Sequence, residues 1–180
     1  MSAGLVLAED LTLPLEAVTE TLVLLSKRGA GKTATASVLV EELLGAGLPV
    51  CVLDPLGVWW GLRAAADGQG SGLPVVILGG DHGDLPLAAT SGQLIADLVV
   101  DDLRSVVLDL SEFSKTQMRS FATAFLEQLY RRSRHPLHLV IDEADLLAPQ
   151  RATAESARLL GACEDIVRRG RSRAAWGAPC

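Results

Sequence analysis

The residues best suited to chemistry lie in "SKRGAGKT", residues 26–33, between an apolar run and a helical pattern. In phosphate-binding loops of this layout, backbone N–H groups of the loop and of the helix N-terminus converge on phosphate oxygens. Lys32 would then reach the β- and γ-phosphates, and the Thr33 hydroxyl would bind Mg²⁺. The pattern predicts an ATP-binding loop that comprises Ser26, Lys27, Arg28, Gly29, Ala30, Gly31, Lys32 and Thr33.

The same loop also fits a second pattern. Gly29, Gly31 and Ala34 match G-x-G-x-x-A, the fingerprint of dinucleotide-binding folds. Asp54 follows about 20 residues later, where such folds have an acid that binds the ribose. Ser26 also replaces the first glycine of the phosphate-binding pattern, although a small side chain is tolerated there if its φ is negative. We favour ATP, because a dinucleotide fold requires neither the Lys-Thr pair nor a distant acidic motif.

That acidic motif is "LHLVIDEAD", residues 137–145, an apolar run that leads directly into Asp142 and Glu143. An acid at the carboxyl end of a buried parallel strand lies at the crevice where α/β proteins bind ligands. Asp142 would hold Mg²⁺ through water, and Glu143 would orient and deprotonate the attacking water. The two motifs together predict Mg-dependent ATP hydrolysis, with Lys32 and Glu143 as catalytic residues. Thr33 and Asp142 are the predicted metal ligands.

The elements that must position these residues alternate between apolar β-rich runs and helical patterns, as in α/β proteins with a mostly parallel sheet flanked by helices. Strands are predicted at 21–26, 49–54, 74–80, 102–111 and 137–145, and helices at 32–47, 114–132 and 153–170. The helix over 114–132 has an apolar stripe that is expected to face the sheet, formed by Met118, Phe121, Phe125 and Leu129.

The length of 180 residues favours a single domain with a sizeable core. Within it we expect a β-hairpin extension over 1–20, an ATPase core over 21–173 and an irregular tail over 174–180. The N-terminal stretch carries acids where a signal peptide would be apolar, and no apolar run is as long as a membrane span. The three cysteines are scattered and form no metal-binding or disulfide pattern. A cytoplasmic protein without membrane contact is expected.

Charge is distributed unevenly along the chain. Residues 1–130 carry 7 basic and 16 acidic side chains, whereas residues 131–180 carry 9 arginines and 6 acids. Arginine suits phosphate and carboxylate recognition, but a solvated helix face is the simpler interpretation. The net charge of −6 argues against broad nonspecific DNA binding by an isolated monomer.

Three further groups of residues admit a structural as well as a functional interpretation. Trp59 and Trp60 are expected to be buried rather than to stack on a base. His138 is expected to be a packed or edge residue of its strand. The residues of "GGDHGDLPL" are expected to form a turn with local hydrogen bonds rather than a metal site, and they include Asp81, His82 and Asp84.

The ordered set of motifs resembles the HerA/FtsK-type motor ATPases, most closely bacterial proteins that carry the HerA central domain. The motifs are "SKRGAGKT", "VLDPLGVWWGLR", "VVLDLSEFSKTQMRSFATAFLEQLY", "VIDEAD" and "VRRGR", and the resemblance covers about residues 5 to 173. It implies a P-loop NTPase core of the RecA or additional-strand type, ATP and Mg²⁺ as cofactors, and hexameric rings. It also implies ATP-driven movement of double-stranded DNA through the ring.

The resemblance gives one more residue a role. Gly170-Arg171 matches a Gly-Arg of the family near the subunit boundary, so Arg171, or else Arg168 or Arg169, would act on the ATP of a neighbouring subunit. An exposed arginine that is merely favoured by the helix dipole is the alternative.

The resemblance breaks off after Arg171. The family continues there into an apolar strand with a polar sensor, placed between the phosphate-loop strand and the Asp142 strand, whereas this chain reads "SRAAWGAPC". We therefore expect the sheet to lack its sensor strand, as in a shortened copy of a longer protein. A second function follows as an alternative, namely a nucleotide-binding fragment or assembly module that does not hydrolyse ATP. A third is an ATPase in signalling or phage defence with no DNA track.

Overall fold

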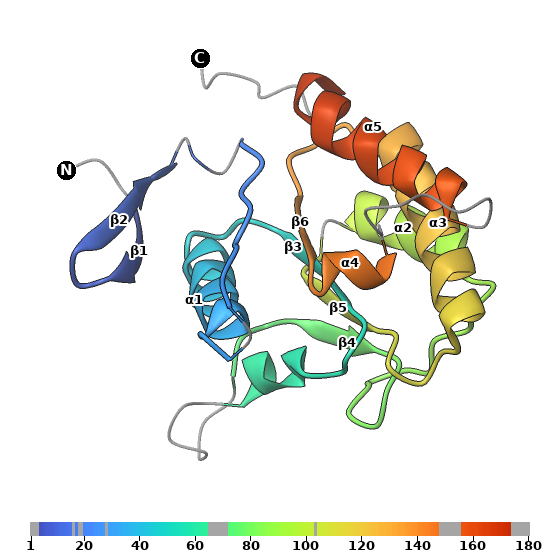
Figure 1. Ribbon diagram of the computed structural model, residues 1–180, viewed down its shortest axis with the longest axis horizontal. Coiled ribbons are helices and arrows are strands. Elements are labelled where there is room, and N and C mark those ends of the chain that lie inside the picture. Colours follow the sequence, from blue (N-terminus) through green and yellow to red (C-terminus); the bar gives the residue numbers. More distant parts are fainter. Residues whose placement is uncertain are drawn as a thin grey trace.

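The computed structural model describes residues 4–15, 17, 20–27, 29–64, 72–102, 104–147 and 156–173, and for 170–173 the backbone alone. A parallel sheet of four strands forms its centre, in the order β4-β5-β3-β6 (Figure 1). The strands are β3 (Val50–Asp54), β4 (Val76–Leu78), β5 (Val106–Asp109) and β6 (His138–Ile141). β3 and β5 are buried throughout, as expected for parallel strands covered on both faces. The predicted α/β class and parallel sheet are confirmed.

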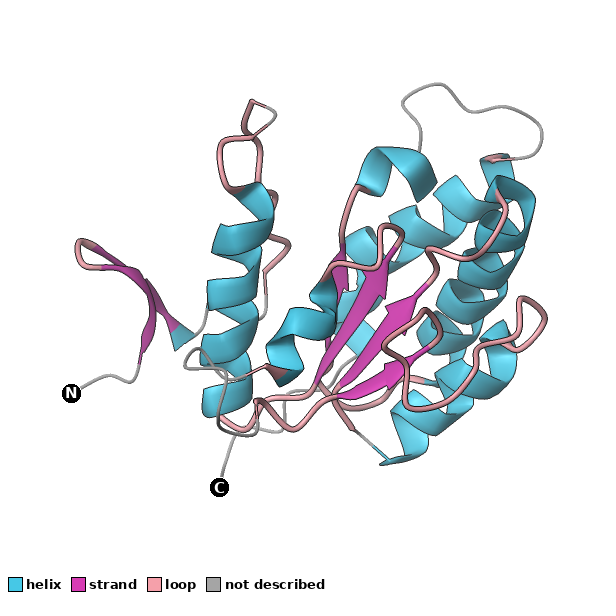
Figure 2. Cartoon of the chain, turned by 90° about the horizontal axis from the view of Figure 1, so that it is seen from below, coloured by secondary structure: helices cyan, strands magenta, loops and turns pink. Residues whose placement is uncertain are grey.

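Helices cover both faces of the sheet (Figures 1 and 2). They are α1 (Lys32–Gly45), the 3₁₀ helix η2 (Trp59–Arg63), α2 (Gly92–Asp102), α3 (Lys115–Arg132), α4 (Ala144–Leu147) and α5 (Ala157–Arg173). α2, α3 and α5 share one apolar core with the sheet, whereas α1 and η2 belong to a second core on the other face. No helix in the described ranges is long and apolar enough to cross a membrane.

α3 shows how local sequence and burial agree. It begins at a capping box, in which the Ser114 hydroxyl accepts from the N–H of Gln117 and the Gln117 side chain accepts from the N–H of Ser114. The predicted apolar stripe is confirmed, because all four of its residues are buried: Met118, Phe121, Phe125 and Leu129.

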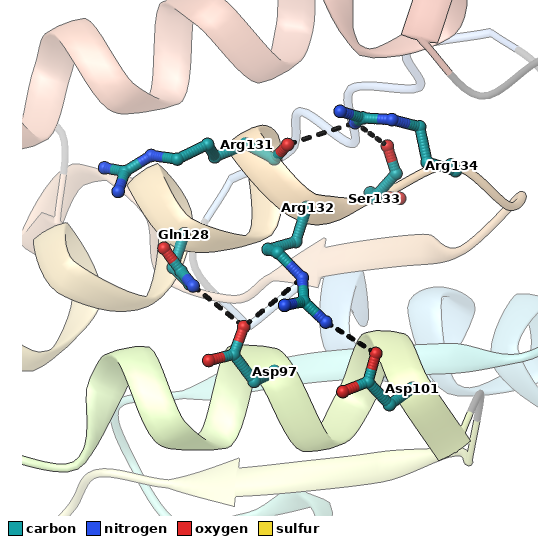
Figure 3. A network of polar contacts seen from close by, with 7 residues as sticks. All are labelled: Asp97, Asp101, Gln128, Arg131, Arg132, Ser133 and Arg134. Carbon is teal, nitrogen blue, oxygen red and sulfur yellow. Dashed lines mark hydrogen bonds and ion pairs between the residues drawn. The ribbon is translucent and has the colours of Figure 1, made fainter.

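Part of the arginine-rich region serves to join α2 to α3 (Figure 3). Arg132 pairs with Asp97 and Asp101 at 3.6 and 2.7 Å, and Gln128 donates to Asp97 at 2.8 Å. Arg134 instead donates to backbone carbonyls at the end of α3. These contacts hold helices together and leave Arg132 committed within the protein.

The predicted hairpin near the N-terminus is present. β1 (Gly4–Ala8) and β2 (Leu11–Pro14) pair antiparallel, apart from the main sheet (Figures 1 and 2). The N–H of Val6 donates to the Glu42 carboxylate at 2.8 Å, and Leu5 is buried in the core that α1 lines. The hairpin is thereby attached to α1.

The predicted strand over 21–26 is wrong. These residues have no strand assignment, and all of them are exposed, with 70% of Val23 and 88% of Leu25 accessible to solvent. β6 pairs with β3 alone in the described sheet, so no strand adjoins it on the side where this segment runs. An apolar run becomes a strand only where a neighbour pairs with its backbone groups, and here that neighbour is missing from the described residues.

Candidate functional site

A cavity of about 670 Å³ separates segment 20–26, which is no part of the sheet, from β6 and the adjoining part of α5. Its wall includes Ser26 and Lys32 from the glycine loop and Asp142 and Glu143 from the end of β6. The fold thus brings both predicted motifs to one cavity, although 110 positions separate Lys32 from Asp142.

The glycine loop has the backbone that only glycine adopts easily. Gly29 and Gly31 have φ of 77° and 86°, and Gly31 is the N-cap of α1. A Cβ at either position would meet no atom within 4 Å among the described residues, so the conformation rather than crowding requires glycine. No side chain caps α1, and N–H groups of its first turn therefore remain available to an anion.

The other predicted loop residues are spread over different environments. Lys27 and Ala30 are exposed, and the Ala30 N–H donates to the Lys27 carbonyl at 3.2 Å. Thr33 is half-buried in the first turn of α1 and is not part of the cavity wall. Arg28 lies outside the described residues.

Asp142 is held by two N–H donors, one on each carboxylate oxygen. Oδ1 accepts from the backbone N–H of Glu143 at 2.9 Å, and Oδ2 accepts from the indole Nε1–H of Trp59 at 2.8 Å. The backbone N–H of Asp142 donates to Leu53 on β3, which extends the strand pairing to this residue. A half-buried carboxylate is therefore fixed at the cavity wall.

Glu143 has the one positive φ among the described non-glycine residues, 43°. This left-handed conformation costs about 1–2 kcal/mol for a residue with a Cβ. Its carbonyl accepts from the N–H of Leu146, which begins the short α4. Backbone strain of this kind clusters at functional sites, where the direction of a side chain matters more than local stability.

The turn after β3 was not predicted to be part of the site. Asp54 is fully buried and accepts backbone N–H groups of Leu56, Gly57 and Trp59 at 3.1, 2.8 and 2.8 Å. Burial raises the pKa of the Asp54 carboxyl above its ordinary value, and the N–H bonds, led by that of Trp59, oppose this rise. Both Asp54 oxygens accept backbone N–H groups of this turn. Asp54 is therefore not available to bind a ribose, although the dinucleotide interpretation requires a ribose-binding acid at this position. The sequence signal was the Asp-Pro-x-Gly turn itself.

The two tryptophans differ. Burial of Trp59 is confirmed, with 2% of its surface exposed, but its indole bond to Asp142 was not foreseen. The prediction that Trp60 is buried is wrong, because 40% of its surface is exposed. Its ring stacks on that of His82, with ring centroids 4.1 Å apart. Trp60 is the second residue of η2 and lies on its solvent side, so only one of two adjacent rings reaches the core.

The remaining polar residues differ in their partners, because Asp84 has several, whereas the buried Nε2 of His138 has no hydrogen-bond partner among the described residues. Asp84 forms an ion pair with Arg63 and accepts the N–H of Ile77 at 2.9 Å, which fixes the loop after β4. His138 is half-buried on β6, and burial lowers the pKa of its imidazole. Its role as an edge residue is confirmed by the strand order.

Of the three candidate arginines, Arg168 and Arg169 are exposed on α5, and Arg169 pairs with Asp165 at 3.4 Å. Arg171 belongs to the last turn of α5, but its side chain lies outside the described residues.

Two of the predicted site residues, Asp142 and Thr33, offer oxygen donors of the kind that Mg²⁺ takes, and Asp142 lies in the cavity wall. Within the described ranges, no group of three or more His, Cys, Asp and Glu residues is placed to hold a metal ion. Mg²⁺ rarely requires such a cage, because it keeps several waters and takes one or two protein oxygens in addition to phosphate oxygens. The Asp142 carboxylate and the Thr33 hydroxyl are oxygen donors of that kind.

Comparison with models of known families, with curated proteins and with solved structures finds no match for this chain. The fold shown is therefore an α/β fold with a parallel four-stranded sheet, and its function has to be argued from the site.

Proposed function

We propose that this protein is a Mg-dependent ATP hydrolase with a P-loop core of the HerA/FtsK type. The observation that carries the proposal is the single cavity whose wall contains Lys32, at the end of the glycine loop, and the Asp142-Glu143 pair that follows β6. The left-handed glycines of the loop and the strained backbone of Glu143 support it.

Each residue would act at a definite point of the reaction. When bound, ATP would supply the phosphoryl group, and Mg²⁺ would neutralise the negative charge of the phosphate oxygens. Lys32 and the N–H groups at the start of α1 would hold the phosphates, and Thr33 and Asp142 would hold the metal. Glu143 would take the proton of the attacking water, within a cavity that keeps the carboxylate and the phosphates close.

Coupling to DNA rests on the resemblance of the motifs. In a hexameric ring, Arg171 would stabilise charge on the ATP of a neighbour, and double-stranded DNA would pass through the pore. The net charge of −6 is compatible with this arrangement, since pore loops rather than a basic monomer would contact the duplex.

Phosphate release with and without duplex DNA tests the proposal. We expect Lys32→Ala and Glu143→Gln each to lower turnover by at least about 100-fold. Lys115→Ala is the matched control, because it removes an exposed lysine at the start of α3, away from the cavity wall, and should leave turnover unchanged. Hydrolysis that survives Lys32→Ala would reject the proposal.

A second candidate is a protein that binds ATP without hydrolysing it. The observation in its favour is that segment 21–26 is unpaired and exposed, so the loop that follows it is not anchored to β6 through a sheet. This candidate predicts ATP binding that depends on Lys32, with phosphate release at background even when DNA is added. DNA-stimulated turnover by this chain would reject it.

A further inference from the structure

A short path of hydrogen bonds connects the buried turn after β3 with the acid at the end of β6. Asp54 accepts from the backbone N–H of Trp59, and the Trp59 indole donates to Asp142 Oδ2, each at 2.8 Å. Trp59 and Asp142 both lie in the cavity wall. We propose that Trp59 is a positioning residue that fixes the Asp142 carboxylate for metal binding. The proposal rests on the metal role of Asp142 in the function proposed above.

The Trp59 indole has little freedom to point elsewhere. Its ring is buried among apolar residues of the core shared by α1, η2 and β3. Its backbone is fixed by Asp54, which also accepts the N–H groups of Leu56 and Gly57. Gly57 has a φ of 68°, and a Cβ there would lie 2.9 Å from Asp109 Oδ2, so this turn is closely packed. The N–H donor is therefore held at a defined point.

Each oxygen of the Asp142 carboxylate accepts one N–H group, and this fixes the orientation of the carboxylate. Trp59 donates to one carboxylate oxygen and the Glu143 N–H to the other, so rotation of the carboxylate would break both bonds. An ionised carboxylate has about four acceptor positions, and those that remain can accept from metal-bound water. Outer partners that orient a ligand in this way typically contribute 10- to 100-fold to metal affinity or activity.

A purely structural role is the alternative, because a buried indole usually finds some partner for its N–H. Loss of the N–H would then lower stability without changing metal affinity. Two measurements test the proposal. The first needs no nucleotide and tests the bond from Trp59 to Asp142, and the second separates the two roles.

The first measurement is the ¹⁵N–¹H spectrum of the indole groups in the protein without nucleotide, with Trp59→Phe used to assign the Trp59 signal. We expect Asp142→Asn to move the Trp59 signal and to leave that of Trp60 in place, since Trp60 stacks on His82. A Trp59 signal that does not respond to Asp142→Asn would overturn the proposal.

The second measurement is the affinity for Mn²⁺, used as a paramagnetic substitute for Mg²⁺, in the presence of a non-hydrolysable ATP analogue. We expect Trp59→Phe to weaken Mn²⁺ binding about 10-fold, whereas Trp60→Phe leaves it unchanged. Replacement of Trp59 by benzothienylalanine, which keeps the double ring but lacks the N–H, should weaken it equally while retaining the fold. Unchanged Mn²⁺ affinity with this isostere would overturn the proposal. If the wild type released no phosphate, the proposed hydrolysis would be rejected. The proposed role of Trp59 would still be tested, because neither the indole spectrum nor the Mn²⁺ affinity requires turnover.

Discussion

The two sides of the cavity are built in different ways. On the side of β3, η2 and β6, buried residues and N–H donors fix the acids, and Asp54 and Trp59 are almost inaccessible to solvent. On the opposite side, segment 20–26 is exposed and pairs with no strand in the described structure. The carboxylate side is thus preorganised by the fold, whereas the side that leads into the glycine loop is exposed and lacks strand pairing among the described residues.

The largest expected contrast comes from the same substitution on each side. Leu53→Ala in β3 should lower the free energy of unfolding by about 2–5 kcal/mol, because Leu53 is fully buried and a cavity remains. Leu25→Ala in the exposed segment should change it by less than about 0.5 kcal/mol. Urea unfolding of both variants measures the difference, and equal losses would show that the segment is packed as tightly as the sheet.

Asp54→Asn tests the preorganised side with a smaller change. An asparagine offers one oxygen, so the N–H of Trp59 would face an amide N–H₂ group instead of an acceptor. One unsatisfied buried donor costs about 1–3 kcal/mol, measurable by urea unfolding. Unchanged stability would mean that the turn after β3 does not depend on this carboxylate.

The contrast also explains what the sequence predicted and what it did not. The strands over 49–54 and 137–145 were identified because apolar runs bounded by proline or acidic residues suit a covered parallel sheet. The equally apolar 21–26 was assigned wrongly, because pairing depends on a neighbour that local sequence does not specify.

Within the site, sequence spacing predicted the glycine loop and the acids of β6, and the structure places both at one cavity. The bond from Trp59 to Asp142 joins residues 83 positions apart. Apolar periodicity predicts that a tryptophan is buried, but it carries no information on where the indole N–H points. Non-local hydrogen bonds were therefore beyond the reach of pattern alone.

At Glu143, the cost of the left-handed backbone can be measured separately from the role of the carboxylate in hydrolysis. Asparagine tolerates the left-handed region better than glutamine does, so Glu143→Asn should be more stable than Glu143→Gln by up to about 1 kcal/mol. Thermal unfolding should then show a difference in Tm of a few degrees, with phosphate release lost in both variants. Identical Tm values would contradict strain at this residue.

The smallest expected effect concerns the loop after β4 and pH. The Ile77 N–H and then Arg63 lower the pKa of Asp84, so its ionised form is favoured by folding. This stabilisation is complete above the ordinary aspartate pKa and is lost as pH falls through the lowered value. Asp84→Asn should therefore reduce the loss of stability in acid, whereas Asp81→Asn, at an exposed position nearby, serves as the control. If Asp84→Asn lost as much stability in acid as the wild type, the contacts of Asp84 with Ile77 and Arg63 would be contradicted.

The central claim is that one cavity binds Mg-nucleotide between Lys32 and the two acids that follow β6, Asp142 and Glu143. Titration of the protein with a fluorescent ATP analogue in the presence of Mg²⁺ tests it most directly. We expect saturable binding that Lys32→Ala weakens at least about 100-fold and that the control Lys115→Ala leaves unchanged. Equal affinity of Lys32→Ala and the wild type would contradict the claim.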